Sequence, residues 1–151
     1  MMRVGAIVVG LFLSAGLVVA SAQEKEVIRM PGSLEGLPFS TAVRVDNMLY
    51  LSGQIGTAPG EGLVRGGIGP ETRQTLENIS RVLEYAGSSL ERVVKCTVFL
   101  ADIGDYGAMN EVYRTFFPES PPARSTVAGS GLALGARVEI ECMALVGGGE
   151  M

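Results

Sequence analysis

The stretch from Pro70 to Ala86 constrains the fold more than any other part of this 151-residue chain. Its apolar residues recur at three- and four-residue spacing, which predicts a helix with one apolar stripe. The stripe comprises Leu76, Ile79, Val82, Leu83 and Ala86. Pro70 suits the first helical position and Gly87 is a typical helix stop. Such a helix needs a second layer that covers its stripe.

A second amphipathic helix is expected from about Asp105 to Phe117, with Asp102 or Asp105 capping its start and Pro118 ending it. Its expected buried stripe is Tyr106, Met109, Val112, Tyr113 and Phe116. Alternating patterns predict strands over 41–45, 48–52, 93–100, 125–128 and 138–146. The pair Asp46-Asn47 between the first two runs is typical of a tight hairpin turn. The resulting order predicts an α+β fold, a mixed sheet with two helices packed on one face.

The opposite face of this sheet has no cover within the chain. Alternation over 93–100 places Val94 with the helix-facing residues and Thr97 and Phe99 on the other face, where Met143 and Leu145 are also expected. An uncovered, partly apolar sheet face predicts a homo-oligomer.

The two cysteines, Cys96 and Cys142, each lie on an apolar strand face. We interpret them as two reduced thiols in the core, because buried cysteines commonly act as small hydrophobic residues. A disulfide is the alternative, since the chain carries an export signal. The sequence does not tell whether their two strands are neighbours.

Residues 1–22 have the layout of a secretory signal peptide, with Arg3 before an apolar run and Ala20-Ser21-Ala22 as a cleavage site. An uncleaved membrane anchor is the alternative. Cleavage leaves 23–151 as a single exported domain, periplasmic or secreted, with no membrane contact. Loss of Arg3 changes the net charge from −4 to −5. An acidic chain without a basic patch disfavours a nucleic-acid partner.

The chain contains no histidine, which excludes histidine-based metal sites and catalytic triads. Its chemistry depends on carboxylates, arginine, hydroxyls, thiols, backbone amides and water. Arg124 follows the rigid pair Pro121-Pro122, and Glu139 and Glu141 share the strand face turned away from the helices. An arginine binds a carboxylate bidentately, and a nearby glutamate can activate a water. A structural Arg–Glu ion pair is the alternative interpretation.

Seven motifs occur in unbroken order between residues 28 and 146. They are Pro38-Phe39-Ser40, Ser52-Gly53-Gln54-Ile55, 72–78, 93–100, Asn110-Glu111-Val112-Tyr113, Pro122-Ala123-Arg124-Ser125 and Val138-Glu139-Ile140-Glu141. Together they resemble the RidA/YjgF/UK114 family. The resemblance implies a chorismate-mutase-like fold, homotrimers with sites between subunits, and no cofactor. It also implies hydrolysis of reactive enamines and imines, such as 2-iminobutanoate and 2-iminopropanoate, to 2-oxo acids and ammonia.

By this resemblance, Arg124 anchors the substrate carboxylate and Glu139 positions the attacking water. Ser52 and Asn110 match residues close to the family's site, and backbone groups near Gly53 help bind substrate.

Two positions depart from the family pattern. Phe39 stands where many members carry tyrosine, and Thr126, also expected at the substrate site, stands where many carry cysteine. Two other functions remain open, an endoribonuclease-like activity and a non-catalytic trimer that binds small carboxylates or acts as a chaperone.

Overall fold

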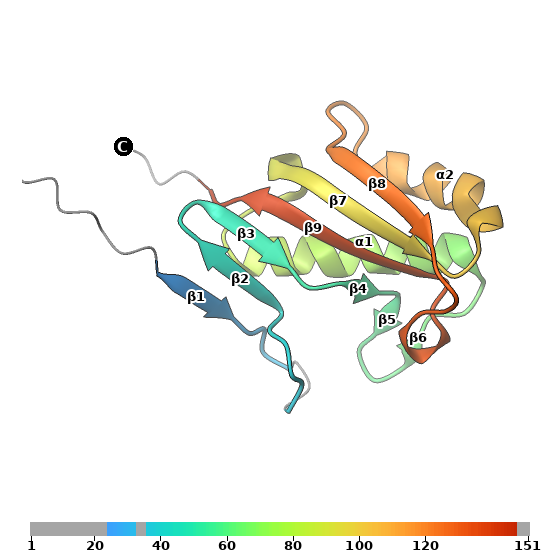
Figure 1. Cartoon of the computed structure of the whole chain (residues 1–151), viewed down its shortest axis with the longest axis horizontal. Helices are drawn as coiled ribbons and strands as arrows, with labels where there is room; N and C mark the ends of the chain where they lie inside the picture. The colour runs from blue at the N-terminus through green and yellow to red at the C-terminus, as the bar shows by residue number, and fades with distance from the viewer. Residues whose placement is uncertain (1–23, 33–35, 148–151) are drawn as a thin grey trace, which may run out of the picture.

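A seven-stranded mixed sheet organises the part of the chain that the computed structural model describes, residues 24–32 and 36–147 (Figure 1). The strand order is β1-β2-β3-β9-β7-β8, with β4 paired to β9, and only β7 and β8 run parallel among these pairs. Its strands are β1 (Lys25–Ile28), β2 (Ala42–Val45), β3 (Met48–Leu51), β4 (Gln54–Ile55), β7 (Val93–Leu100), β8 (Ala123–Ala128) and β9 (Val138–Leu145). The signal peptide expected over 1–22 lies outside the described residues.

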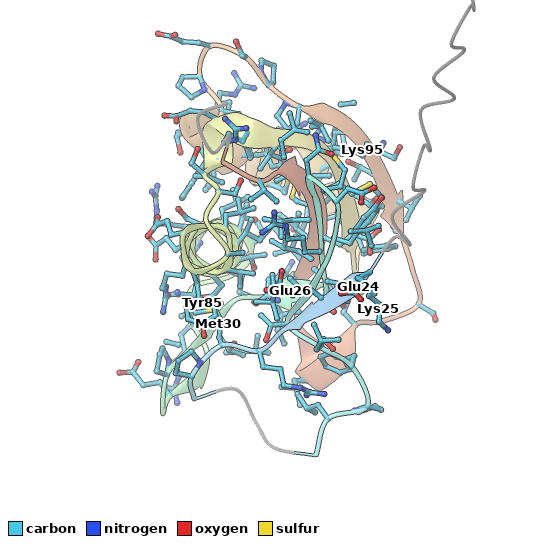
Figure 2. All side chains as sticks on the ribbon, turned by 90° about the vertical axis from the view of Figure 1, so that its left-hand side faces the viewer. Glu24, Lys25, Glu26, Met30, Tyr85 and Lys95 are labelled. Carbon is cyan, nitrogen blue, oxygen red and sulfur yellow. A yellow bond between two sulfur atoms is a disulfide. The ribbon has the colours of Figure 1, made fainter. Side chains whose placement is uncertain are left out.

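Two helices, α1 (Ile68–Tyr85) and α2 (Tyr106–Phe116), cover one face of the sheet, which confirms the α+β prediction. Figure 2 shows the sheet from the side, with α1 and its Tyr85 on the opposite side from Lys95 of β7. The remaining elements are a small hairpin, β5 (Thr57–Ala58) and β6 (Gly62–Leu63), and the short 3-10 helices Leu90–Arg92, Ile103–Asp105 and Ala133–Gly135. Within the described residues, neither helix is both long and apolar enough to cross a membrane.

The core lies between α1 and the central strands. Leu76, Ile79 and Leu83 of α1 are fully buried, as the helical stripe predicts. They pack with inward residues of β7 and β9, such as Val98 and Ile140. Full burial of such a side chain stabilises the fold by about 1.5–3 kcal/mol. The hairpin prediction is also confirmed, because Asp46 adopts a φ of 53° in the turn between β2 and β3.

Two burial predictions are wrong for local reasons. Val94 is 40% exposed, because a bulge after Val93 shifts the register of β7 against β9 and reverses the alternation there. Tyr106 is 42% exposed although it falls on the predicted stripe of α2. It is the first residue of that helix, and its ring lies beside the edge strand β8 rather than under the sheet.

The prediction of two reduced cysteines is also wrong. Cys96 and Cys142 stand directly opposite each other on the antiparallel strands β7 and β9, with their Cα atoms 4.1 Å apart, and form a disulfide. Both residues are at least 98% buried. The disulfide therefore links the two central strands beneath α1 inside the core.

Candidate functional site

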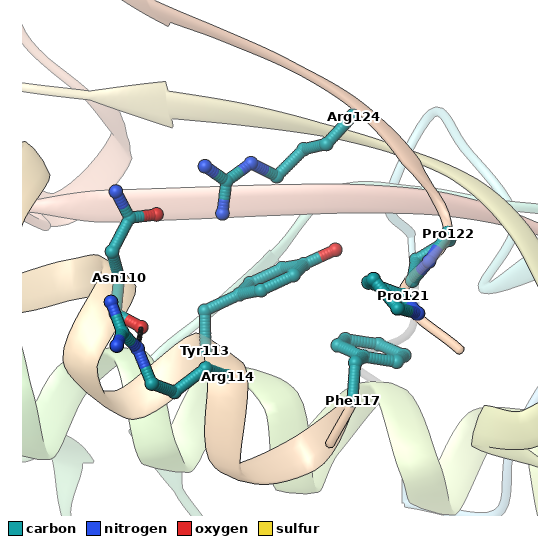
Figure 3. A pocket seen from close by; sticks show the side chains of 7 residues that line it. All are labelled: Asn110, Tyr113, Arg114, Phe117, Pro121, Pro122 and Arg124. Atoms are coloured by element: carbon teal, nitrogen blue, oxygen red, sulfur yellow. Dashed lines mark hydrogen bonds between the residues drawn. The ribbon is translucent and has the colours of Figure 1, made fainter. Parts of the chain in front are cut away.

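Arg124 extends from the edge strand β8 toward α2. Its register partner on β7 is Cys96, which faces the helices, so Arg124 leaves the sheet on that same side. Its Nη2 lies 3.3 Å from the Tyr106 hydroxyl and its Nη1 lies 4.0 Å from the Met109 sulfur. Its Cζ lies 4.6 Å from the centroid of the Tyr113 ring. Figure 3 shows the guanidinium reaching over α2 toward Asn110 and Tyr113.

Aromatic rings hold this cation without neutralising it. A guanidinium over an aromatic face is attracted by the ring quadrupole, by roughly 0.5–2 kcal/mol. No ion pair involves Arg124 among the described residues. Its charge and most of its N–H groups therefore remain available to an anionic ligand, and the plain ion-pair interpretation does not apply within one chain.

The two tyrosines near Arg124 differ in their acidity. Burial raises the pKa of Tyr113 to about 12, and the positive charge of Arg124 only partly opposes that shift. The pKa of Tyr106 is lowered, first by a hydrogen bond with the Asn110 side chain and then by the hydrogen bond and charge of Arg124. Tyr113 is therefore a neutral wall of the site, and Tyr106 is the more readily ionised phenol.

A cavity of about 440 Å³ adjoins Arg124. Its lining residues are Asn110, Tyr113, Arg114, Phe117, Pro121, Pro122 and Arg124 (Figure 3). Aromatic and proline surfaces form one part of it, and the guanidinium and amide groups form another. Such a cavity suits a small anion that carries an apolar group.

Thr126 also lies on the helix-facing side of β8, two residues after Arg124. Its Oγ1 atom is buried and has no hydrogen-bond partner among the described residues. A buried hydroxyl without a partner costs free energy, and Thr72 in α1 and Tyr113 have the same property.

Glu139 belongs to a second group of residues. It lies on β9 and is partly buried, on the sheet face turned away from the helices, as its alternation with Val138 and Ile140 predicts. Gly53 lies directly against it. A Cβ atom built on Gly53 would overlap the Glu139 carboxylate, at 2.8 Å from its Cδ and 3.0 Å from its Cγ. Only glycine at position 53 leaves room for this carboxylate.

Hydrogen bonds tie Ser52, the residue before Gly53, to the segment just before β2. The Ser52 hydroxyl donates to the Ser40 carbonyl at 2.7 Å, and the Ser52 amide donates to the Thr41 carbonyl at 3.1 Å. Phe39, the residue before Ser40, is 54% exposed. The structure therefore brings Ser52, Gly53 and Glu139 together, and the hydrogen bond from Ser52 to Ser40 places Phe39, in the segment before β2, near them.

Arg124 and Glu139 do not meet within one chain. Arg124 lies on the helix-facing side of the sheet with Asn110 and Thr126, whereas Glu139 lies on the opposite face with Gly53. Along the strands they are also offset, since Arg124 is level with Cys142 and Glu139 is level with Val127. The predicted site residues thus form two half-sites, one on each side of the sheet.

Tyr106 and Tyr113 were not predicted as site residues, because both fall on the expected core stripe of α2. No pattern in the sequence distinguishes them, since their role depends on β8 lying beside that helix. A metal centre has no candidate here, because residues 24–32 and 36–147 contain no group of three or more clustered ligand side chains.

Comparisons with known proteins identify the family of the chain. The model of the family described as "Endoribonuclease L-PSP" matches residues 34–146. A mouse protein named 2-iminobutanoate/2-iminopropanoate deaminase is 47% identical over 111 residues, which cover 73% of this chain and 82% of the mouse protein.

Two solved structures have the same fold. The yeast protein YEO7 superposes with a TM-score of 0.76 at 39% identity, covering 82% of this chain and 99% of the yeast chain. TdcF from E. coli, whose crystal structure has bound serine, superposes with a TM-score of 0.73 at 32% identity, covering 81% and 99%. The chain belongs to the RidA/YjgF/UK114 family.

Proposed function

We propose that the protein hydrolyses reactive enamines and imines of 2-amino acids, of the 2-iminobutanoate and 2-iminopropanoate type, to 2-oxo acids and ammonia. The observation that carries this proposal is Arg124, a cation held by two aromatic rings beside a cavity of about 440 Å³. The name of the mouse relative supports the same reaction. Bound serine in TdcF is consistent with a site that accepts a small amino-acid-like carboxylate.

In this proposal Arg124 binds the substrate carboxylate through two parallel N–H···O bonds. The neighbouring imine carbon is then fixed in position, which replaces a bimolecular encounter by a reaction within one complex. Glu139 holds a water molecule and accepts its proton during attack on that carbon. Hydrolysis needs no covalent nucleophile, which suits a chain without histidine.

The two half-sites require a second copy of the chain. We propose a homotrimer in which Arg124 of one subunit faces Glu139 of its neighbour. The outer sheet face supports this assembly, because the face that carries Glu139 also exposes Tyr50 and Met143.

Light scattering coupled to size exclusion tests this assembly, and the mature protein is expected to have three times the mass of one chain. A monomer that still hydrolyses imines at full rate would contradict the shared site.

Replacing Arg124 by alanine tests the proposed function directly. A charge-assisted bidentate contact contributes roughly 1.5–3 kcal/mol, so kcat/KM is expected to fall by about 10- to 150-fold. Arg124→Lys should recover only part of this loss, because lysine keeps the charge but lacks the planar fork. The measurement is ammonia and 2-oxo acid release from an imine produced in situ by an amino-acid oxidase.

Arg44→Ala is the matched control. Arg44 is a partly exposed arginine on β2 that donates to the Asp46 carbonyl at 2.9 Å and lies 3.9 Å from Glu26, far from the Arg124 cavity, so its removal should leave kcat/KM unchanged. Equal losses of kcat/KM in both variants would mean that the change in net charge causes the effect. Full activity in Arg124→Ala would refute the role of this arginine, and an inactive wild-type protein that still binds 2-oxo acids would favour a non-catalytic binding protein.

Endoribonuclease activity is the second candidate, because the family description carries that name. The net charge of −4 and the absence of histidine oppose it, since RNA binding relies on a basic surface. RNA incubated with the purified protein is therefore expected to remain intact under conditions where imine hydrolysis proceeds.

A further inference from the structure

Tyr106 is the residue closest to Arg124 to which neither the motif comparison nor the family description gives a role. It opens α2, and its hydroxyl oxygen lies 3.3 Å from Arg124 Nη2. Its ring is 5.6 Å from the guanidinium carbon and 42% of the residue is exposed. The phenol therefore borders both the anchoring cation and open space.

The hydrogen bonds of this phenol leave its proton free. The oxygen accepts an N–H from Arg124, which has no acceptor atom of its own. The Asn110 side chain, one helical turn later, also lowers the pKa of Tyr106 through a hydrogen bond. Because the oxygen accepts from Arg124, the phenol keeps its own O–H to donate. A ligand can reach that O–H from the exposed side of the residue.

We propose that Tyr106 is the general acid that protonates the departing amine when a 2-imino acid bound to Arg124 is hydrolysed. This inference rests on the proposed function and deepens it. The imine nitrogen is two covalent bonds from the carboxylate carbon that Arg124 holds. A group hydrogen-bonded to the same guanidinium is therefore positioned to reach that nitrogen.

The reaction balances in two steps. In the first, water forms a bond to the imine carbon, the π electron pair of the C=N bond moves to nitrogen, and the water proton taken by Glu139 passes to that nitrogen. The product is a neutral carbinolamine. In the second, Tyr106 gives its proton to nitrogen and the C–N electron pair leaves with ammonia. The hydroxyl O–H pair forms the C=O bond of the 2-oxo acid, and the hydroxyl proton returns through solvent to the phenolate.

Tyr106 suits this task better than the other groups near Arg124. Tyr113 is 95% buried, its hydroxyl has no partner among the described residues, and burial raises its pKa to about 12. It is therefore a weak and enclosed acid. Asp105, the chain neighbour of Tyr106, is bound by the guanidinium of Arg137 at 2.8 Å. Arg124 is thus the charged group that contacts the Tyr106 phenol, and a nearby cation makes a phenol a stronger acid.

Tyr106→Phe tests the inference because it keeps the ring and removes only the hydroxyl. We expect kcat to fall by about 10²-fold or more while KM changes little, since general acid catalysis acts in the transition state. The wild-type rate should fall as pH rises through the pKa of Tyr106, because the ionised phenol has no proton to give. This pKa lies below that of an ordinary tyrosine. This alkaline limb should be absent in Tyr106→Phe. Tyr85→Phe, which removes an exposed phenol hydroxyl on α1, should behave as wild type.

The outcomes separate the two proposals. Wild-type turnover with unchanged kcat in Tyr106→Phe overturns the role of Tyr106 and leaves the proposed function intact. A raised KM with unchanged kcat also overturns it, because Tyr106 would then only orient Arg124. A wild-type protein that hydrolyses no imine overturns the proposed function and this inference together.

Discussion

Replacing Glu139 by glutamine is expected to lower kcat for imine hydrolysis by about 10²- to 10⁴-fold. Glutamine has nearly the same shape, but its amide cannot accept a proton from the attacking water. KM should change little, because we propose that the substrate carboxylate binds to Arg124 on the other half-site. The measurement is steady-state ammonia release at several substrate concentrations.

Glu141→Gln provides the matched control on the same strand. Glu141 lies two residues further along β9, on the same sheet face and with the same intermediate burial, but opposite Thr97 rather than against Gly53. Its replacement should leave kcat within about twofold of wild type, since surface substitutions are usually nearly neutral. Equal losses in the two variants would contradict the choice of Glu139.

Gly53→Ala tests the position of the Glu139 carboxylate without changing Glu139 itself. A methyl group at this position overlaps the Glu139 carboxylate, so the side chain must move from its place. We therefore expect a loss of kcat similar to that of Glu139→Gln, although no ionisable group has been changed. Normal activity in Gly53→Ala would mean that the position of Glu139 does not matter for the reaction.

Local patterns predicted most of the fold because they depend on neighbours in sequence. The helical stripe that includes Leu76 and Ile79 identified the buried side of α1. Alternation along β9 placed Glu139 and Glu141 on the uncovered face, because successive side chains of a strand point to opposite sides. The turn at Asp46 was predictable because few residue types tolerate its positive φ.

The features that escaped prediction all depend on contacts between distant segments. Cys96 and Cys142 pair because β7 and β9 are adjacent in one particular register, and the sequence of neither strand specifies which strand lies beside it. Val94 turns outward because of a bulge in that pairing. Tyr106 joins the site because β8 lies beside the start of α2. Arg124, Glu139 and Glu141 were candidates from the sequence itself, and the family resemblance selected Glu139. The separation of Arg124 from Glu139 followed only from the strand topology.

Removing the disulfide with the double variant Cys96→Ala/Cys142→Ala is expected to reduce the free energy of unfolding by about 4 kcal/mol. The two cysteines are 46 residues apart, and cross-linking a loop of that size restricts the unfolded chain by about this amount. A loss of 4 kcal/mol should lower the melting temperature by about 10 °C or more. Denaturant unfolding of residues 23–151, without reductant, measures the effect.

Repeating the unfolding with reductant separates the cross-link from packing. With reductant, the free energy of unfolding of wild type should fall close to that of the double variant, because reduction removes the cross-link that restricts the unfolded chain. The free energy of unfolding of the double variant should not change. Identical midpoints for wild type with and without reductant, or two reactive thiols in the unfolded, unreduced protein, would contradict a stabilising disulfide.

Disulfides persist mainly in oxidising compartments. The disulfide joins β9, which carries Glu139, to β7, which pairs with β8, and a disulfide at this place accords with the export that we propose from residues 1–22.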